Sequence, residues 1–140
     1  MSSQPYQNPS YPNQPYQSQN FEQQMQQMPQ LLLSSSMEIP GYQIVDFYGL
    51  VFGITVRSRG AGGQCVGNCQ SCAGGEISAY VQSNYEARNE SLERLMHEAY
   101  LRGANAIISV KFDSSEAGQS GQLMNIVAYG TAVKVIKKMQ

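Results

Sequence analysis

The chain has 140 residues, a length that suits one domain. Its formal net charge is −1 and only 14% of its residues are charged, so no basic excess favours nucleic acid or an acidic membrane surface. It has neither an apolar run of about 20 residues nor the basic and apolar regions of a secretory signal. The three cysteines are an odd number, which argues against a secreted disulfide framework. We therefore expect a cytoplasmic protein without nucleic-acid or membrane partners.

Residues 1–30 form a low-complexity segment rich in Gln, Asn, Pro, Ser and Tyr. Such a segment cannot bury enough apolar surface to offset the entropy lost on ordering, so the composition predicts a disordered tail before a domain at 31–138. An alternative is a segment that associates weakly with itself or with a protein partner. Its basis is an aromatic residue at every fifth position, at Tyr6, Tyr11, Tyr16 and Phe21.

Two stretches between residues 31 and 57 are predicted to form strands. Residues 31–36 are a short apolar-then-polar piece that suits an edge strand, and Pro40–Gly41 is a turn signal. Residues 43–57 are the first main strand, in which Gly49 and Gly53 indicate a bulge, a bend or a close backbone approach. A hairpin broken at Gly49 is the alternative.

Residues 76–102 read as one long helix that precedes a buried strand. Small or apolar residues recur at helical spacing, and Glu90–Arg94 and Glu98–Arg102 are spaced for ion pairs on the other face. The helix starts at residue 76, or at Ser83 if Ser83 and Glu86 form a capping box. Gly103 is the expected stop, because the residue after a helix often needs a left-handed backbone. The stripe comprises Ile77, Tyr80, Val81, Leu92, Leu95, Met96 and Ala99.

After Gly103 the period of the pattern becomes two. Residues 106–113 alternate as a half-buried strand, with Ala106, Ile108, Val110 and Phe112 on one side. Residues 114–121 are a Gly/Ser connection, and 122–136 form a last strand that is apolar on both faces. One helix covers one face of a sheet, so we expect copies of the chain to pack sheet against sheet. A monomer with an exposed apolar patch is the alternative.

The sequence resembles the YbjQ-like family, which carries a heavy-metal-binding label. The resemblance rests on YQIVDFYGLVFG from Tyr42, GGEISAY before the helix, RGANAIISVKFD from Arg102 and IVAYGTAVKV from Ile126. It covers roughly residues 31–138. It implies an α+β fold like a dodecin subunit, in the order β-α-β-β, with one long helix on a three-stranded antiparallel sheet and a short N-terminal edge strand. It also implies a homopentamer.

The Gly-rich stretch 57–75 departs from that family in carrying Cys65, Cys69 and Cys72. Three thiolates at this spacing can converge on Zn(II), Cu(I) or an iron–sulfur cluster, and the fourth ligand would be His97, water or another subunit. The chain is too short for the barrel of a radical S-adenosylmethionine enzyme, which has three similarly spaced cysteines. Incidental or redox-active thiols are the alternative, and a helix start just after Cys72 would favour its thiolate. The glycines at 57–63 also suit an anion-binding nest.

These observations favour a non-enzymatic, homo-oligomeric protein that binds zinc or another soft metal through the cysteines. The alternative is an oligomeric scaffold that displays the low-complexity tail to a protein partner. The sequence contains no set of nucleophile, base and acid, and no phosphate loop with a lysine, so an enzyme has the least support. His97, on the polar face of the helix, is expected to be a solvated surface residue.

Overall fold

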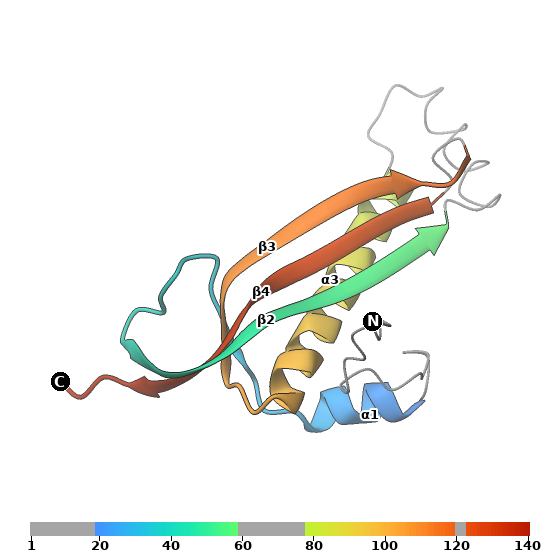
Figure 1. Ribbon diagram of the computed structural model, residues 1–140. Coiled ribbons are helices and arrows are strands. Elements are labelled where there is room, and N and C mark those ends of the chain that lie inside the picture. Colours follow the sequence, from blue (N-terminus) through green and yellow to red (C-terminus); the bar gives the residue numbers. More distant parts are fainter. Residues whose placement is uncertain (1–18, 59–77, 120–122) are drawn as a thin grey trace, which may run out of the picture.

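The computed structural model describes residues 19–58, 78–119 and 123–140 of the chain. Its elements are α1 (Gln19–Gln27), β1 (Leu32–Leu33), β2 (Tyr42–Ser58), α3 (Ser78–Leu101), β3 (Ala106–Ala117) and β4 (Leu123–Lys137). Figure 1 shows the long helix α3 beside a sheet built from the strands. The fold is α+β, as predicted.

The sheet has four strands in the order β1-β3-β4-β2. Strands β2, β4 and β3 are antiparallel neighbours, and the two-residue β1 runs parallel to β3 at the edge. The three-stranded antiparallel sheet and the short N-terminal edge strand are therefore confirmed. Strand β2 pairs with β4 without interruption by a turn from Tyr42 to Ser58, so the alternative of a hairpin at Gly49 is wrong.

Helix α3 begins at Ser78 and ends where the sequence predicted. A helix start at Ser83 is wrong, because α3 is already helical at Ser78 and continues through Ser83. The carboxylate of Glu86 accepts hydrogen bonds from Gln82 and Arg57. Gly103 has a φ of 86° and its N–H donates to the Tyr100 carbonyl, which closes the helix. The two ion pairs expected along the helix, Glu90–Arg94 and Glu98–Arg102, are both present.

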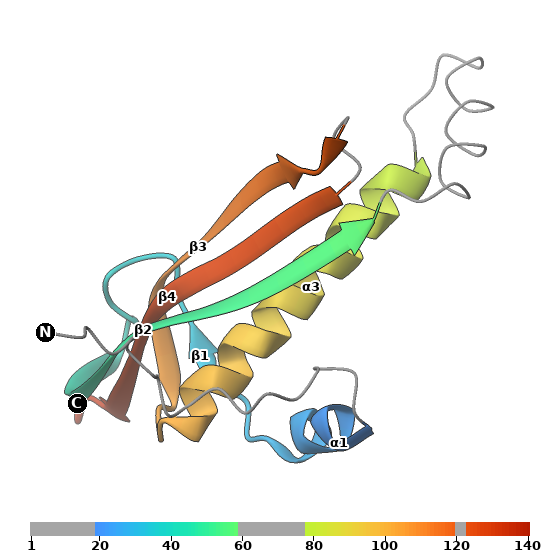
Figure 2. The same ribbon diagram turned by 45° about the vertical axis from the view of Figure 1, so that its right-hand side comes forward.

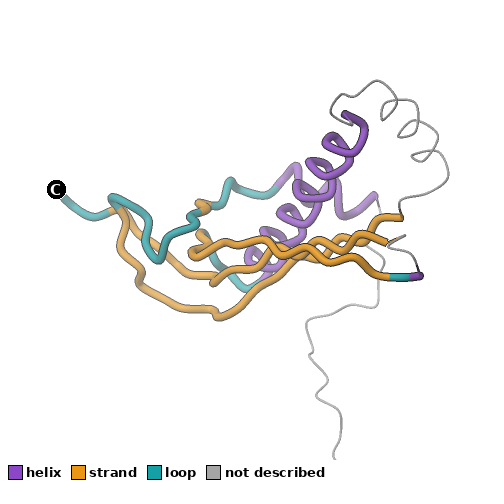
Figure 3. Tube along the Cα trace, turned by 90° about the horizontal axis from the view of Figure 1, so that it is seen from above, coloured by secondary structure: helices purple, strands orange, loops and turns teal. Residues whose placement is uncertain are grey.

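Helix α3 lies over one face of the sheet, as Figure 3 shows from above. The main core fills the space between them. Its residues are small or branched, which lets the helix approach closely: Leu31, Val51, Leu95, Ala99, Ala104, Ile107, Ala128 and Ala132. The approach is closest at Gly53, where an added Cβ would stand 2.0 Å from the carbonyl oxygen of Ser91. The prediction of a close backbone approach is confirmed at this glycine.

Bulges change which side chains face the helix. Strand β2 shifts register twice before Gly49, which has a φ of 86°. Strand β3 shifts between Ile108 and Lys111, around Ser109, which has a φ of 53°. The inserted residue places Val110 on the helix side together with Ile107, so the unbroken alternation predicted for 106–113 is wrong. Strand β3 also continues to Ala117, four residues into the predicted connection.

The second face of the sheet is covered at one end only. Ala106, Ile108, Val133 and Val135 form a smaller cluster there. Leu32 of β1, Ile39 and the first residue of β2, Tyr42, pack on it. Further along, large apolar side chains of β2 and β4 stay exposed: Leu50, Ile54, Val56 and Tyr129. The chain thus buries part of the face that the sequence assigned entirely to neighbouring copies.

Helix α1 lies within the segment whose composition predicted disorder. It begins at Gln19 and lies beside the C-terminal end of α3 in Figures 1 and 2. The prediction is wrong for residues 19–27, because Phe21, Met25 and Met28 form an apolar stripe that a docked helix can bury. The aromatic repeat at residues 6, 11 and 16 lies outside the described residues.

Candidate functional site

The candidate site lies at the end of the domain where β2 ends at Ser58 and α3 begins at Ser78. Ser58 pairs with Leu123 and Arg57 with Met124, so the start of β4 lies at this end as well. Cys65, Cys69 and Cys72 fall between Ser58 and Ser78, outside the described residues, as does the predicted glycine nest apart from its first two residues.

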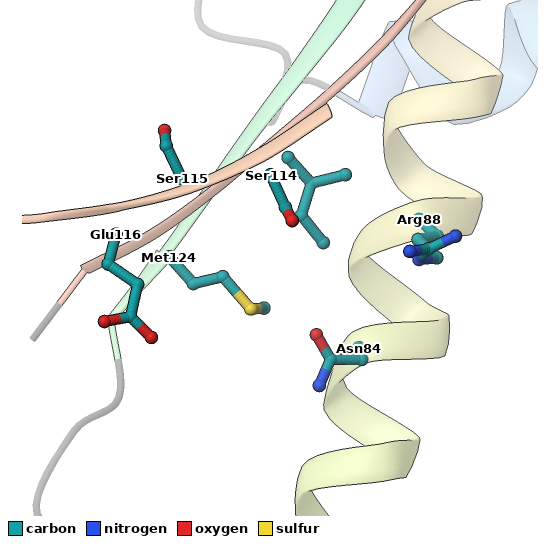
Figure 4. A pocket seen from close by; sticks show the side chains of 7 residues that line it. Asn84, Arg88, Ser114, Ser115, Glu116 and Met124 are labelled. Atoms are coloured by element: carbon teal, nitrogen blue, oxygen red, sulfur yellow. The ribbon is translucent and has the colours of Figure 1, made fainter. Parts of the chain in front are cut away.

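A pocket of about 180 Å³ opens at this end, between α3 and the far halves of β3 and β4. Figure 4 shows Asn84 and Arg88 on the helix, across from Ser114, Glu116 and Met124 on the strands. Ser115 and Ile126 complete the lining. Polar side chains therefore line the opening between helix and sheet at this end, and Arg88, Ser114 and Glu116 are exposed to solvent.

Arg88 carries the positive charge of this pocket. Its guanidinium lies over the ring of Phe112, 5.2 Å from the ring centroid, which fixes the cation against the sheet. Together with the serine hydroxyls it offers hydrogen-bond donors, while the thioether of Met124 offers a soft, weak acceptor. The pocket can thus hold a small polar group beside a polarisable sulfur atom.

Ion pairs tie the end of β2 to α3 beside the pocket. Arg57 contacts Glu86 at 3.2 Å and Glu90 at 3.1 Å, and Glu90 also pairs with Arg94. The carboxylates are about one third to one half exposed, so each pair adds at most about 1 kcal/mol. Their main effect is to hold the strand end in a fixed place relative to the helix.

A second candidate surface is the exposed apolar face of β2 and β4. Strand β2 is also an edge strand, and side chains of α3 form hydrogen bonds with its backbone groups. Glu98 accepts a hydrogen bond from the N–H of Phe52 at 3.0 Å, and Arg102 donates to the carbonyl of Leu50 at 2.8 Å. Arg94 donates to the carbonyl of Ile54. Since these backbone groups are engaged, a further strand cannot pair there without displacing the helix side chains.

His97 does not lie at the candidate site. It is nineteen residues beyond Ser78 along α3, or about 28 Å at about 1.5 Å per residue. It is half-buried against α1, so the prediction of a solvated surface residue is wrong, because α1 was not foreseen. This distance also argues against His97 as a metal ligand at the domain end formed by Ser58 and Ser78 of its own chain.

Within residues 19–58, 78–119 and 123–140, no three His, Cys, Asp or Glu side chains gather in a way that could hold a metal ion. The three cysteines lie outside these described residues. Their donor chemistry fits such an ion, because thiolates bind Zn(II) and Cu(I) tightly.

The model of a family described as "Putative heavy-metal-binding", the YbjQ family, matches residues 31–136. The chain belongs to this family. Relatives include the UPF0145 protein of Sulfurisphaera tokodaii, 49% identical over 78% of this chain and 94% of its own. UPF0145 protein Ta0182 of Thermoplasma acidophilum is 49% identical over 77% of this chain and 89% of its own.

Among solved structures, a DUF74-family protein of unknown function from Pediococcus pentosaceus superposes with a TM-score of 0.53. It is 17% identical to this YbjQ family member and covers 76% of this chain and 98% of its own, so the likeness concerns the fold. No described helix of the chain has the length and apolar character needed to cross a membrane.

Sequence reasoning missed the pocket. Its residues come from three elements, and their meeting depends on the register of β3 with β4, which the bulge at Ser109 sets. One signal was available: Asn84 and Arg88 are polar residues one helical turn apart, in line with the buried Ser91 and Leu95.

Proposed function

We propose that this protein is a soft-metal-binding member of the YbjQ family, with the thiolates of Cys65, Cys69 and Cys72 as its ligands. The observation that carries the proposal is the C-x3-C-x2-C spacing in a domain of this family. Zinc or copper(I) is the expected ion, because thiolates are soft donors. The bound metal acts as cargo or as a local cross-link; no catalysis is proposed.

The described residues support Met124 as an additional metal ligand. Met124 pairs in register with Arg57, the penultimate residue of β2, and its thioether faces the pocket at this end of the domain. A thioether suits copper(I) better than zinc. The proposal therefore predicts that Met124 strengthens copper(I) binding and leaves zinc binding unchanged.

The test is metal analysis of purified protein. The wild type, loaded with Zn(II) or Cd(II) and desalted, should retain metal by mass spectrometry and show thiolate-to-cadmium ultraviolet absorption. The triple variant Cys65→Ser, Cys69→Ser, Cys72→Ser should lose both. Equal metal content in the two proteins would end the proposal. Met124→Leu is the matched variant, expected to weaken copper(I) binding alone.

We further propose that the protein is a homo-oligomer, of which a pentamer is the expected form, and that copies meet through the exposed face of β2 and β4. Leu50 is 60% exposed and Val56 is 56% exposed on this face. Large contiguous apolar surface of this kind is uncommon on monomers. The occupied backbone groups along β2 favour contact between faces over strand addition at that edge.

A second candidate function is that of a scaffold that displays the low-complexity tail. Helix α1 favours it, because Phe21 of α1 and Met28 just after it attach the described start of the tail to the domain. If this is right, a protein lacking residues 1–18 loses a partner that the triple cysteine variant keeps. A partner retained by the shortened chain would count against the scaffold.

A further inference from the structure

Helix α1 contacts the domain around the only histidine of the chain. The ring of Phe21 meets the imidazole of His97 edge to face, with centroids 5.1 Å apart and an interplanar angle of 69°. Nε2 of His97 lies 2.9 Å from Oε1 of Gln24, within hydrogen-bond distance. Both contacts come from one face of α1 and join it to the last turns of α3.

The apolar contact continues from this histidine to the core. Phe21 and Met25 are half-buried on one side of α1, and Met28, the residue directly after the helix, is half-buried as well. Met28 packs against the main core, beside Leu31. The other residues of the helix are glutamines, one asparagine and one glutamate, so the apolar side chains supply most of the attraction.

Three features indicate that this contact is reversible. Helix α1 has nine residues, fewer than the roughly 12–15 that an isolated helix needs to persist in water. The three anchoring side chains are only partly buried. The helix lies ahead of residues 31–136, the part of the chain that the family model matches, so the domain of the family does not include it.

We propose that the α3 surface around His97 is a docking site for an aromatic-anchored helix, occupied here by α1 of the same chain, and that protonation of His97 weakens this docking. Docking takes the imidazole partly out of water, which disfavours its charged form. A helix that binds this surface therefore needs the features of α1: it is short and amphipathic, and it carries an aromatic residue and a methionine one turn apart.

Burial lowers the pKa of the docked His97 imidazole from its ordinary value of 6.5. When α1 is released, the imidazole returns to water and its pKa rises toward that value. A group whose pKa is lower in the docked state contributes docking stability that is fully present above the released pKa. This stability falls as the pH drops through about 6.5 toward the docked pKa.

The charged neighbours of His97 set the limits of this effect. Glu98 and Arg94 are held by their hydrogen bonds to β2, and Arg102 pairs with Glu98. Glu93, one turn before His97, and Glu22, next to Phe21, carry negative charge that favours the imidazolium. These charges act to raise the pKa of His97, whereas burial lowers it, and the effect of burial prevails in the docked state.

The test uses the full chain and NMR, since a single histidine gives one titrating imidazole. In the wild type, His97 should titrate below 6.5, and the methyl signals of Met25 and Met28 should change with the same midpoint. Phe21→Ala should move the midpoint toward 6.5. His97→Gln, which keeps a hydrogen-bond donor for Gln24 and cannot be protonated, should keep α1 docked at low pH.

Two outcomes would overturn the proposal. One is a His97 midpoint that is the same in the wild type and in Phe21→Ala. The other is a His97→Gln protein whose methionine methyl signals still change with the wild-type midpoint, which would assign release to another group. Arg88→Gln, at the far half of α3, is the control variant and should leave the His97 titration unchanged.

Discussion

Gly53 of β2 lies directly beneath Ser91 of α3, so closely that a Cβ on Gly53 would stand 2.0 Å from the Ser91 carbonyl oxygen and 2.5 Å from the Leu95 nitrogen. Both are backbone atoms of a helix and cannot turn away. Gly53→Ala should therefore force helix and sheet apart and cost about 3 kcal/mol or more of the free energy of unfolding. Urea unfolding, followed by circular dichroism, measures this loss of stability.

Gly49→Ala is the matched control for this prediction. Gly49 has a φ of 86° and no atom within 4 Å of an added Cβ, so its substitution tests backbone strain without a clash. We expect a cost of roughly 1–2 kcal/mol. A loss at Gly53 no greater than at Gly49 would show that the helix does not lie as close to the strand as described.

Asn105 extends the pairing between β3 and β4 with its side chain. Its Nδ2 donates to the Val135 carbonyl at 2.9 Å, and its Oδ1 accepts from the Val135 N–H at 2.8 Å. Asn105→Ala leaves both backbone groups of the buried Val135 without these partners and should cost about 2 kcal/mol. Asn125→Ala removes one long bond of 3.4 Å to Ser115 and should cost less than about 1 kcal/mol. If thermal unfolding showed the same loss of stability for both variants, the structural role given to Asn105 would be contradicted.

Glu98 protects the backbone of the edge strand β2. Glu98→Ala removes the acceptor of the Phe52 N–H and the partner of Arg102, and should cost about 1–3 kcal/mol. It should also increase concentration-dependent light scattering, because an unoccupied strand edge can pair with another copy. Glu93→Ala, an exposed change on the same helix, should stay within about 0.5 kcal/mol of the wild type. If Glu98→Ala matched Glu93→Ala in both measurements, the edge would not need this protection.

The exposed face of β2 and β4 can be tested with charge. The double variant Leu50→Lys, Ile54→Lys places two ammonium groups on side chains that are 60% and 43% exposed. Charges that a neighbouring copy would bury should shift the mass measured by light scattering from oligomer to monomer. Tyr85→Lys, at a 63% exposed position on α3, is the control and should leave the mass unchanged. A wild type that is already a monomer would refute the proposed interface.

Local patterns were sufficient for the order of β1, β2, α3, β3 and β4, although not for α1. The helical stripe ending at Gly103 and the two ion pairs of α3 follow from side-chain spacing, which a helix converts directly into a face. The edge strand near Leu32 and the glycine in close approach at Gly53 were also foreseen. These features depend on neighbours in the chain, so the sequence encodes them without knowledge of the packing.

The sequence by itself determined the α+β architecture, the family and the three thiols. Only the tertiary structure decided which residues share a face after the bulge at Ser109, and that Arg88 meets Phe112 beside a pocket. It also decided that α1 covers His97. The reason is physical: one inserted residue reverses every later side chain of a strand, and the stability of a nine-residue helix depends on the surface it docks against.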